Sequence, residues 1–167
     1  MRPEVVLQDG SLRLRPVVLP DDVAVAAPWY RDPEVLHFSE GEGTPPYDAA
    51  LVEEMYRAMA GRCELYLIEV LTPAGWYPIG DAALCGEAGT PIVIGEAAFR
   101  SQGLGARVLQ LLIGRARALG WSRMVVKGIY TYNERSLRLY ARAGFRVCEQ
   151  VTDDAGREMW RLELSLE

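Results

Sequence analysis

The segment Arg100-Ser101-Gln102-Gly103-Leu104-Gly105-Ala106 joins a short apolar run to the longest segment with helical periodicity in the chain. The run before it, Pro91 to Gly95, is typical of a strand. The residues after it predict a long helix that ends at Leu119, before Gly120. Apolar residues recur along that helix with the helical period, at Leu104, Val108, Leu111, Leu112 and Leu119. The quoted segment is therefore predicted to be a glycine-containing turn between a strand and a helix.

Such a turn is suited to holding a phosphate group. The first N–H groups of a helix have no partner within the helix, and its N-terminus carries about half a positive charge. Glycine at positions 103 and 105 lets the backbone approach an anion without an intervening side chain. Arg100 would add a charge-assisted contact.

The glycine pattern alone is weak evidence. With 16 glycines in the chain, about one to two G-x-G triplets are expected by chance, and a second one, Gly41-Glu42-Gly43, falls in a predicted loop. No G-K-[ST] follows Gly105, which excludes a Walker loop, and Val108 stands where a dinucleotide-binding motif has its third glycine. The position between a strand and a helix is what gives Gly103 and Gly105 their weight.

The rest of the chain predicts one α/β domain over residues 1–167. Asp48 is expected to start a helix over 49–60 with Leu51, Val52, Met55 and Met59 on one face, whereas residues 32–46 predict a mobile connection. Further helices are expected over 21–27 and 133–143. Strands are expected over 11–17, 65–71, 78–84, 91–95, 123–129, 145–151 and 158–166. The fold is therefore a mixed, mostly antiparallel central sheet of about six to seven strands, flanked by helices.

Charge is distributed unevenly along the 167 residues, whose net charge is −5. Residues 1–99 contain 16 acidic and 6 basic side chains, a balance of −10, and residues 100–167 contain 7 acidic and 12 basic ones, a balance of +5. A basic half suits a phosphorylated ligand, and an acidic half suits a cationic partner. Because the chain lacks overall basicity or a dense basic tract, we expect no nucleic-acid binding.

The lengths of the apolar runs and the positions of cysteine and histidine bear on cellular location and metal binding. No segment approaches the roughly 18 consecutive apolar residues of a membrane span, and the run Val5 to Leu7 is too short for a signal peptide. We therefore expect a cytoplasmic protein with no membrane partner. Cys63, Cys85 and Cys148 form no C-x-x-C pair, so neither a disulfide nor a zinc site is expected, only small buried side chains. His37 is the single histidine, which excludes a histidine-based metal site.

Two ordered motifs resemble those of a known family. Arg100 to Ala106 resembles the Q/R-x-x-G-x-G/A signature of the GNAT superfamily of N-acetyltransferases. Downstream, the segment N-E-R-S-L-R-L-Y-A-R-A-G-F, Asn133 to Phe145, is similar to that family's N-x-x-S/A-x-x-L-Y-x-x-x-G-F element. Leu12 to Pro16 resembles the branch of ribosomal-protein acetyltransferases, and Tyr30 to Tyr56 resembles aminoglycoside 6′-acetyltransferases. The sequence leaves the choice between these branches open.

This resemblance implies the GNAT fold and acetyl-coenzyme A as the acetyl donor, with no metal. In the family, backbone amides of the signature hold the pyrophosphate of coenzyme A. The implied cofactor-binding residues are Ile94, Gly95, Arg100, Ser101, Gln102, Gly103, Leu104, Gly105, Ala106, Asn133 and Ser136. Asn133 is equally a candidate helix cap.

Direct acyl transfer needs no enzyme nucleophile, but it needs an acid, a route for the amine proton and a donor to the oxyanion. The family places a tyrosine beside the sulfur of coenzyme A, which makes Tyr140 the candidate acid, with a role as an ordinary core aromatic as the alternative. Glu96 is the candidate base, with Asp81 and Glu87 as alternatives. The oxyanion donor is expected to be a backbone N–H between Ile94 and Glu96.

Acidic and aromatic side chains alternate in the first third of the chain, a combination that suits a cationic amine. The candidate acceptor-binding residues are Trp29, Tyr30, Phe38, Glu40 and Asp81. The acceptor is expected to be a primary amine of a small cationic molecule or of a protein N-terminus. The alternative to an enzyme is a module of the same fold that binds coenzyme A without catalysis. Either would be a monomer or a homodimer.

Overall fold

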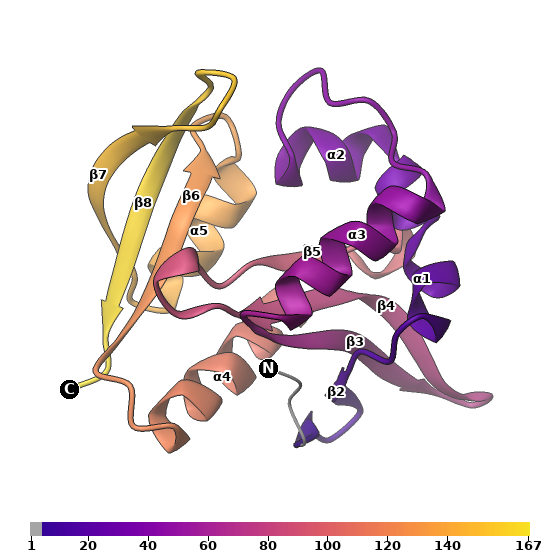
Figure 1. The fold of residues 1–167 in the computed structure, drawn as a ribbon. Helices are drawn as coiled ribbons and strands as arrows, with labels where there is room; N and C mark the ends of the chain where they lie inside the picture. Colours follow the sequence, from indigo (N-terminus) through magenta and orange to yellow (C-terminus); the bar gives the residue numbers. More distant parts are fainter. Residues whose placement is uncertain (1–4) are drawn as a thin grey trace.

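Two antiparallel sheets organise the computed structural model, which describes residues 5–167 (Figure 1). The first sheet has the order β1-β2-β3-β4-β5, and its strands are β1 Leu7–Asp9, β2 Leu12–Pro16, β3 Glu64–Thr72, β4 Gly75–Leu84 and β5 Ile92–Ile94. The second has the order β6-β8-β7, and its strands are β6 Arg123–Tyr130, β7 Arg146–Thr152 and β8 Glu158–Ser165. The expected α/β class with mostly antiparallel pairing is confirmed, and its strands divide between two sheets.

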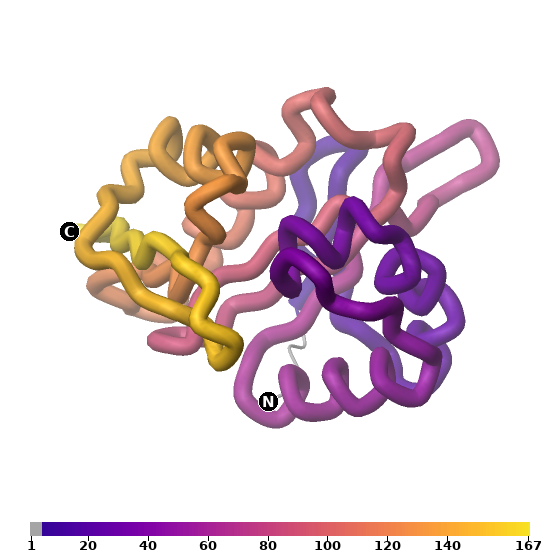
Figure 2. The backbone as a smooth tube through the Cα atoms, turned by 90° about the horizontal axis from the view of Figure 1, so that it is seen from above, coloured from indigo at the N-terminus to yellow at the C-terminus, as the bar shows by residue number. Residues whose placement is uncertain are grey.

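Within the described residues, five helices cover these sheets: α1 Asp21–Ala26, α2 Pro33–Ser39, α3 Ala49–Ala60, α4 Leu104–Ala118 and α5 Glu134–Arg142. The view from above shows the N-terminal helices on one side of the molecule and α5 with β7 and β8 on the other (Figure 2). Short 3-10 turns lie at Trp29–Arg31, Gly86–Ala88 and Ala97–Phe99.

Strand β3 shows how the first sheet becomes a central layer. Alternate side chains of a strand point to opposite faces. Leu65 and Leu67 pack in the cluster with α1 and α3, whereas Tyr66 and Ile68 pack in the cluster with α4. All four side chains are at most 1% exposed. The sheet therefore separates a layer of N-terminal helices from a layer formed by α4, and the α4 cluster continues into α5, β6 and β8.

Strand β5 lies at the edge of the first sheet, where it pairs only with β4. The close approach of the two strands requires Gly80, because a Cβ there would lie 1.9 Å from the carbonyl oxygen of Val93. The second sheet begins at β6, and the space between β5 and β6 is called the gap below (Figure 1). The chain leaves β5 through the turn to α4, so the predicted strand, glycine turn and helix are confirmed as β5, residues 95–103 and α4.

Helix α3 has the predicted bounds and the predicted cap, since the Asp48 carboxylate accepts a hydrogen bond from Leu51 N–H at 2.8 Å. Of the predicted apolar face, Val52, Met55 and Met59 pack in the core cluster. Leu51 does not, since its side chain is 40% exposed, and the fully buried Tyr56 was not predicted.

The predicted mobile connection over 32–46 is wrong for its first half, which forms α2. Asp32 caps this helix by accepting a hydrogen bond from Glu34 N–H at 2.9 Å, and Pro33 occupies the first helical turn. Cap and proline together favour a helix start. The glycine- and proline-rich composition of the following residues concealed this signal.

The expectation of three unlinked, buried cysteines is wrong as well. Cys63 and Cys85 form a disulfide between the end of α3 and the end of β4, with Cα atoms 4.4 Å apart. Cys148 is free and exposed. Cys63 directly precedes Glu64, and Cys85 directly follows Leu84, the residue paired with Glu64. Strand register, which sequence spacing does not reveal, therefore brings the two cysteines together.

Candidate active site

The site begins at the unpaired edge of β5. Pro91 C=O accepts a hydrogen bond from β4 at 3.1 Å, and Gly95 N–H donates one to β4 at 2.7 Å. In an antiparallel pair, residues that exchange these bonds alternate with residues whose N–H and C=O groups point away from the partner strand. By this alternation, the N–H groups of Ile92 and Ile94 point away from β4. They face the gap between the two sheets.

A bulge-like irregularity ends this strand. The N–H groups of Gly95 and Glu96 both donate to the carbonyl oxygen of Ile79, at 2.7 and 3.0 Å. Two consecutive residues therefore oppose one residue of the partner strand, which bends the chain away from β4. Of the predicted oxyanion donors between Ile94 and Glu96, two have their N–H groups engaged in this way, and Ile94 is the one whose N–H faces the gap.

Helix α4 presents a bare N-terminus to the same gap. Gly103 is its N-cap with a left-handed backbone (φ 77°), and no side chain caps the helix. A residue with a Cβ rarely adopts this conformation, so the glycine is required by the turn. Gly105 lies against α5, since a Cβ there would be 3.4 Å from Leu139 Cδ2. The first N–H groups of α4 are therefore available to a ligand that lies between α4 and α5.

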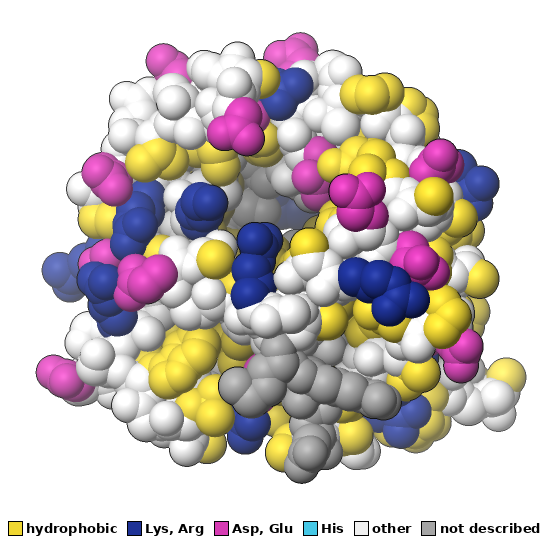
Figure 3. All heavy atoms as spheres, in the orientation of Figure 1, with side chains coloured by type: hydrophobic (Ala, Val, Ile, Leu, Met, Phe, Trp, Pro, Cys, Tyr) yellow, Lys and Arg dark blue, Asp and Glu magenta, His cyan; other side chains and the backbone are white. Residues whose placement is uncertain are grey.

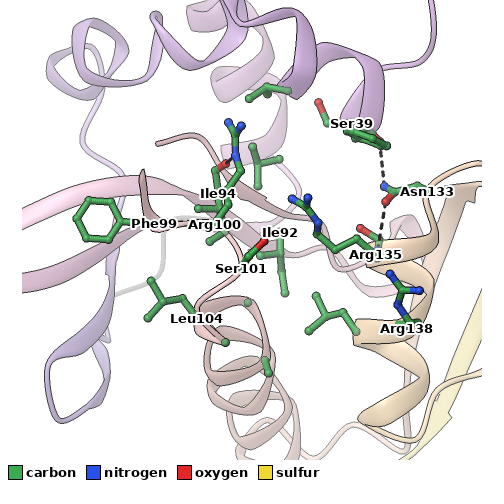
Figure 4. Close-up of a pocket in the computed structure, with 18 of the residues that line it drawn as sticks. Ser39, Ile92, Ile94, Phe99, Arg100, Ser101, Leu104, Asn133, Arg135 and Arg138 are labelled. Atoms are coloured by element: carbon green, nitrogen blue, oxygen red, sulfur yellow. Dashed lines mark hydrogen bonds between the residues drawn. The ribbon is translucent and has the colours of Figure 1, made fainter. Parts of the chain in front are cut away.

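A cavity of about 650 Å³ occupies this place. It contains most of the predicted cofactor-binding residues, and α2 forms its roof while β5, α4 and α5 form its other walls (Figure 4). The predicted residues that line it are Ile94, Arg100, Ser101, Gly103, Leu104, Gly105, Ala106, Asn133 and Ser136. Gly95 and Gln102 lie outside this lining; Gln102 donates to the carbonyl oxygen of Ala98 at 2.7 Å.

Arg100 lines the cavity, but its guanidinium group turns toward α2 (Figure 4). It donates to the carbonyl oxygens of Ile94 and Gly95 at 2.9 and 3.0 Å. It also forms ion pairs with Glu34 at 2.8 Å and Asp32 at 3.3 Å. Arg100 therefore fastens α2 to the end of β5, and its contact with a phosphate stays a prediction.

Asn133 also connects two elements. Its side-chain oxygen accepts a hydrogen bond from Ser136 N–H at 3.2 Å and so caps α5, the alternative considered from sequence. Its amide nitrogen donates to Phe38 C=O of α2 at 3.5 Å. Tyr132 adds a hydrogen bond to His37 C=O and stacks on the His37 ring. Helix α2 is thus fixed by Arg100 at one end and by the β6–α5 connection at the other.

Tyr140 lies behind the wall of this cavity. Its side chain is 4% exposed, and its hydroxyl donates to the carbonyl oxygen of Thr90 at 2.6 Å. Burial raises the pKa of the Tyr140 phenol above its ordinary value, so the group stays protonated. Thr90 precedes β5 by two residues, which places the phenol beside Ile92, at the opposite end of the strand from Gly103.

The candidate bases Glu96 and Glu87 are paired with side chains other than Tyr140. Glu96 accepts a hydrogen bond from the Trp29 indole at 2.9 Å, at the far end of β5. Thr90 and Glu96 lie on either side of β5, six positions apart in sequence, which spans at most about 20 Å. Glu87 is exposed and forms ion pairs with Arg123 and Arg161 at 2.7 and 3.4 Å.

The predicted acceptor-binding residues form a separate cluster. Tyr30 and Tyr56 both donate to Oδ2 of Asp81 at 2.6 Å, and the Asp81 side chain is buried. Burial raises the pKa of Asp81 to about 6, although the two phenols oppose this effect. Tyr47 stacks on Tyr30 and donates to Glu40 at 3.2 Å, and burial raises the pKa of Glu40.

The structure thus brings Tyr30, Glu40 and Asp81 into one neighbourhood. Trp29 is engaged with Glu96 instead. Phe38 is the one predicted acceptor residue in the lining of the large cavity. A second cavity of about 500 Å³ shares Glu34 and Phe38 with it and continues along α2 to Thr44.

Three arginines of α5 were missed from the sequence: Arg135, Arg138 and Arg142 all line the large cavity. Their spacing of three and four residues puts them on one face of the helix, together with the motif residue Leu139. That spacing was visible in the sequence and would have identified them. In the space-filling view the surface is hollowed between α5 and α2, with basic side chains beside the hollow (Figure 3).

Comparison with known proteins agrees with this geometry. The family model "Acetyltransferase (GNAT) domain" matches residues 11–146. The chain belongs to the GNAT acetyltransferase family. No curated protein sequence matches it. The family assignment thus rests on the domain model, whose match contains β5, α4 and α5 and therefore the whole candidate site.

Solved structures share this GNAT fold over nearly the whole chain. A domain from Methanocaldococcus jannaschii is 16% identical, with a TM-score of 0.79 and coverage of 93% of this chain and 98% of that one. The aminoglycoside acetyltransferase AAC(6')-Ib in complex with coenzyme A is 20% identical, with a TM-score of 0.73 and coverage of 93% and 95%. Spermidine N-acetyltransferase from Vibrio cholerae, with coenzyme A and spermine, is 13% identical, with a TM-score of 0.74 and coverage of 94% and 96%. At these identities the likeness concerns the fold.

Residues 5–167 contain neither a membrane-spanning helix nor a group of side chains that could bind a metal. None of their helices has the length and apolarity needed to cross a membrane. Within the same range, no three His, Cys, Asp or Glu side chains lie together in a way that could hold a metal ion.

Proposed function

We propose that this chain is a single-domain enzyme that transfers an acetyl group from acetyl-coenzyme A directly to a primary amine. The observation that carries the proposal is one continuous path of hydrogen-bond donors. It runs from the bare N-terminus of α4, along the N–H groups of Ile94 and Ile92, to the phenol of Tyr140. The cavity of about 650 Å³ accompanies the first part of this path.

Coenzyme A fits the chemistry of the path. Its diphosphate would be held by the α4 N-terminus, where Gly103 and Gly105 present no side chain beyond Cα. Its pantetheine arm carries amide groups. These could form hydrogen bonds with the open edge of β5, as the backbone of an additional strand would. Acetyl-coenzyme A would supply the acetyl group as a thioester at the end of that arm. On this path, that end would lie near Ile92 and Tyr140.

The residues at this end meet the needs of acyl transfer. An N–H group of the β5 edge would donate to the oxygen that becomes negatively charged during attack by the amine. Tyr140, held protonated by burial, would turn its single O–H from the carbonyl oxygen of Thr90 to the departing sulfur. Its raised pKa exceeds that of a thiol, so the phenol would stabilise the thiolate as a donor without becoming a phenolate. The proton lost by the amine balances the one that the sulfur finally takes up.

The acceptor is proposed to be a small cationic amine. The ring of Phe38 lines both cavities and suits an ammonium group through cation–π attraction. The nearby cluster of Asp81 and Glu40 adds negative potential. A protein N-terminus is the alternative acceptor, and it would need to reach the same point beneath α2.

A panel of amines tests the proposal. The purified chain would be mixed with acetyl-coenzyme A and, in turn, with aminoglycosides, polyamines and N-terminal peptides, and release of the free thiol would be recorded. We expect thiol release with at least one small polycationic amine. Tight binding of coenzyme A without turnover on any amine would instead indicate the non-catalytic sensor. Absence of coenzyme A binding would overturn both.

A further inference from the structure

The arginines of α5 differ from most other arginines of the protein. Arg15, Arg100 and Arg115 each form close ion pairs with carboxylates, at 2.7 to 2.8 Å. Among the described residues, Arg135 and Arg142 form no ion pair at all, and both are exposed. Three neighbouring arginines line the cavity, and two of them lack a carboxylate partner, which indicates a binding surface for an anion.

Arg138 belongs with these two. Its one ion pair, with Glu134, is long at 3.9 Å, and both side chains are largely exposed, so the pair contributes little. Arg138 and Arg142 are one helical turn apart, so their guanidinium groups extend from the same face of α5. Arg135 lies one turn nearer the N-terminus, and Figure 4 shows it reaching into the cavity toward Ser101.

A single contact fixes where these arginines lie relative to the turn before α4. Gly105 packs against Leu139, since a Cβ at position 105 would touch its side chain at 3.4 Å. Leu139 lies between Arg138 and Arg142 in sequence. These two arginines therefore flank the point where α5 meets the N-terminus of α4, on the side away from Asn133 and α2.

We infer that Arg138 and Arg142 hold the 3′-phosphate on the ribose of coenzyme A and so discriminate it from dephospho-coenzyme A. This inference rests on the proposed function. The diphosphate would use the α4 N-terminus, and the 3′-phosphate is a second, separate dianion a few bonds away. With Arg100 engaged by Asp32 and Glu34, the α5 arginines are the cations of this cavity that remain available to it.

Calorimetric titration with coenzyme A and with dephospho-coenzyme A tests this inference. For the wild-type protein we expect coenzyme A to bind at least tenfold more tightly than the dephospho form. In the double variant Arg138→Gln/Arg142→Gln this ratio is expected to fall to within about twofold of one. The affinity for dephospho-coenzyme A should stay unchanged, because it lacks the group that the two arginines contact.

Two single variants serve as matched controls. Arg117→Gln removes an exposed arginine of α4 outside the cavity and should leave the ratio of affinities unchanged. Arg135→Gln, nearer the turn before α4, should weaken both ligands by a similar factor. The selective loss in the double variant should also shrink as salt is raised, because exposed charges are screened.

The outcomes separate the inference from the proposed function. Equal wild-type affinity for the two ligands, or equal weakening of both in the double variant, would overturn the inference and leave the proposed function intact. If neither ligand produced heat with the wild-type protein, the proposed function would fail first. A retained preference for coenzyme A in the double variant would also overturn the inference.

Discussion

The two sides of the gap differ in whether their polar groups already have partners within the protein. On the cofactor side, the edge of β5, the N-terminus of α4 and Arg135 and Arg142 of α5 have donors without partners among residues 5–167. On the acceptor side, polar groups are paired with one another, as in Tyr30 and Tyr56 with Asp81 and Trp29 with Glu96. The first arrangement is ready for a large anion, whereas the second is an internally satisfied wall. Residue type therefore indicated the class of ligand. Which residues can contact that ligand depends on whether they already form hydrogen bonds or ion pairs within the protein.

The largest effect is expected from a substitution that forces β4 and β5 apart. In Gly80→Ala the new Cβ would lie 1.9 Å from a backbone oxygen of β5, which cannot move aside without separating the strands. We expect the free energy of unfolding to fall by about 3 kcal/mol and coenzyme A binding to be lost in titration. Gly114→Ala, at an uncrowded glycine within α4, should instead raise stability by about 0.5–1 kcal/mol. Normal ligand binding by Gly80→Ala would refute the proposed role of the β5 edge.

Next in size is the loss of the phenol of Tyr140. Tyr140→Phe removes the hydrogen bond to Thr90 and the donor to the departing sulfur, and it should lower turnover by about 10²-fold or more. Affinity for coenzyme A, measured by titration, should change little, because the phenol lies outside the large cavity. A lower melting temperature with unchanged turnover would show that Tyr140 is only a core aromatic.

Asp81 tests the paired side. Its raised pKa of about 6, against an ordinary 3.8, means that the folded state binds more protons than the unfolded state between these values. The free energy of unfolding therefore falls as pH rises through this window, and the charged Asp81 destabilises the folded state by up to about 3 kcal/mol at neutral pH. Asp81→Asn keeps an acceptor for both phenols and removes the charge. We expect the variant to be more stable than wild type at pH 7.5, with the difference vanishing near pH 4 in denaturant titrations.

A matched buried carboxylate should behave in the opposite way. Asp22 is buried too, but it is paired with Arg15 at 2.7 Å. Asp22→Asn should therefore destabilise the protein at neutral pH, since it removes the nearer of the two carboxylates paired with Arg15. If Asp81→Asn were equally destabilising at pH 7.5, the phenols would be compensating the charge fully, and the contrast between the two sides would weaken.

The smallest effect concerns Arg100. Its contacts with α2 and with the end of β5 indicate that Arg100→Gln loosens α2, at a cost of about 1–2 kcal/mol. For a chain of this length that lowers the melting temperature by about 2–8 °C. Thermal unfolding would show this decrease, whereas titration should show less than a threefold change in coenzyme A affinity. A tenfold loss of affinity with an unchanged melting temperature would make Arg100 the phosphate ligand that the motif implies.

Local patterns were sufficient for most of the fold. The Asp48 cap and the glycine after residue 60 predicted α3 with its observed bounds, and the strand, turn and helix around Gly103 were predicted in the same way. Helix α2 was not predicted, although Asp32 and Pro33 carry a start signal, because the glycines and prolines that follow favour a loop. The disulfide was missed because the register of β3 and β4 is set by contacts between strands, not by cysteine spacing.

The sequence by itself determined the family motifs, the glycine turn before α4, the uneven charge and the class of chemistry that these imply. Only the tertiary structure decided which polar groups are already paired, because the partners are far apart in sequence. Arg100 and Glu34 are 66 residues apart, Trp29 and Glu96 are 67 apart, and Tyr30 and Asp81 are 51 apart. A side chain is available to a ligand only if folding has not given it another partner. That is why the arginines of α5 become stronger candidates than the arginine of the motif.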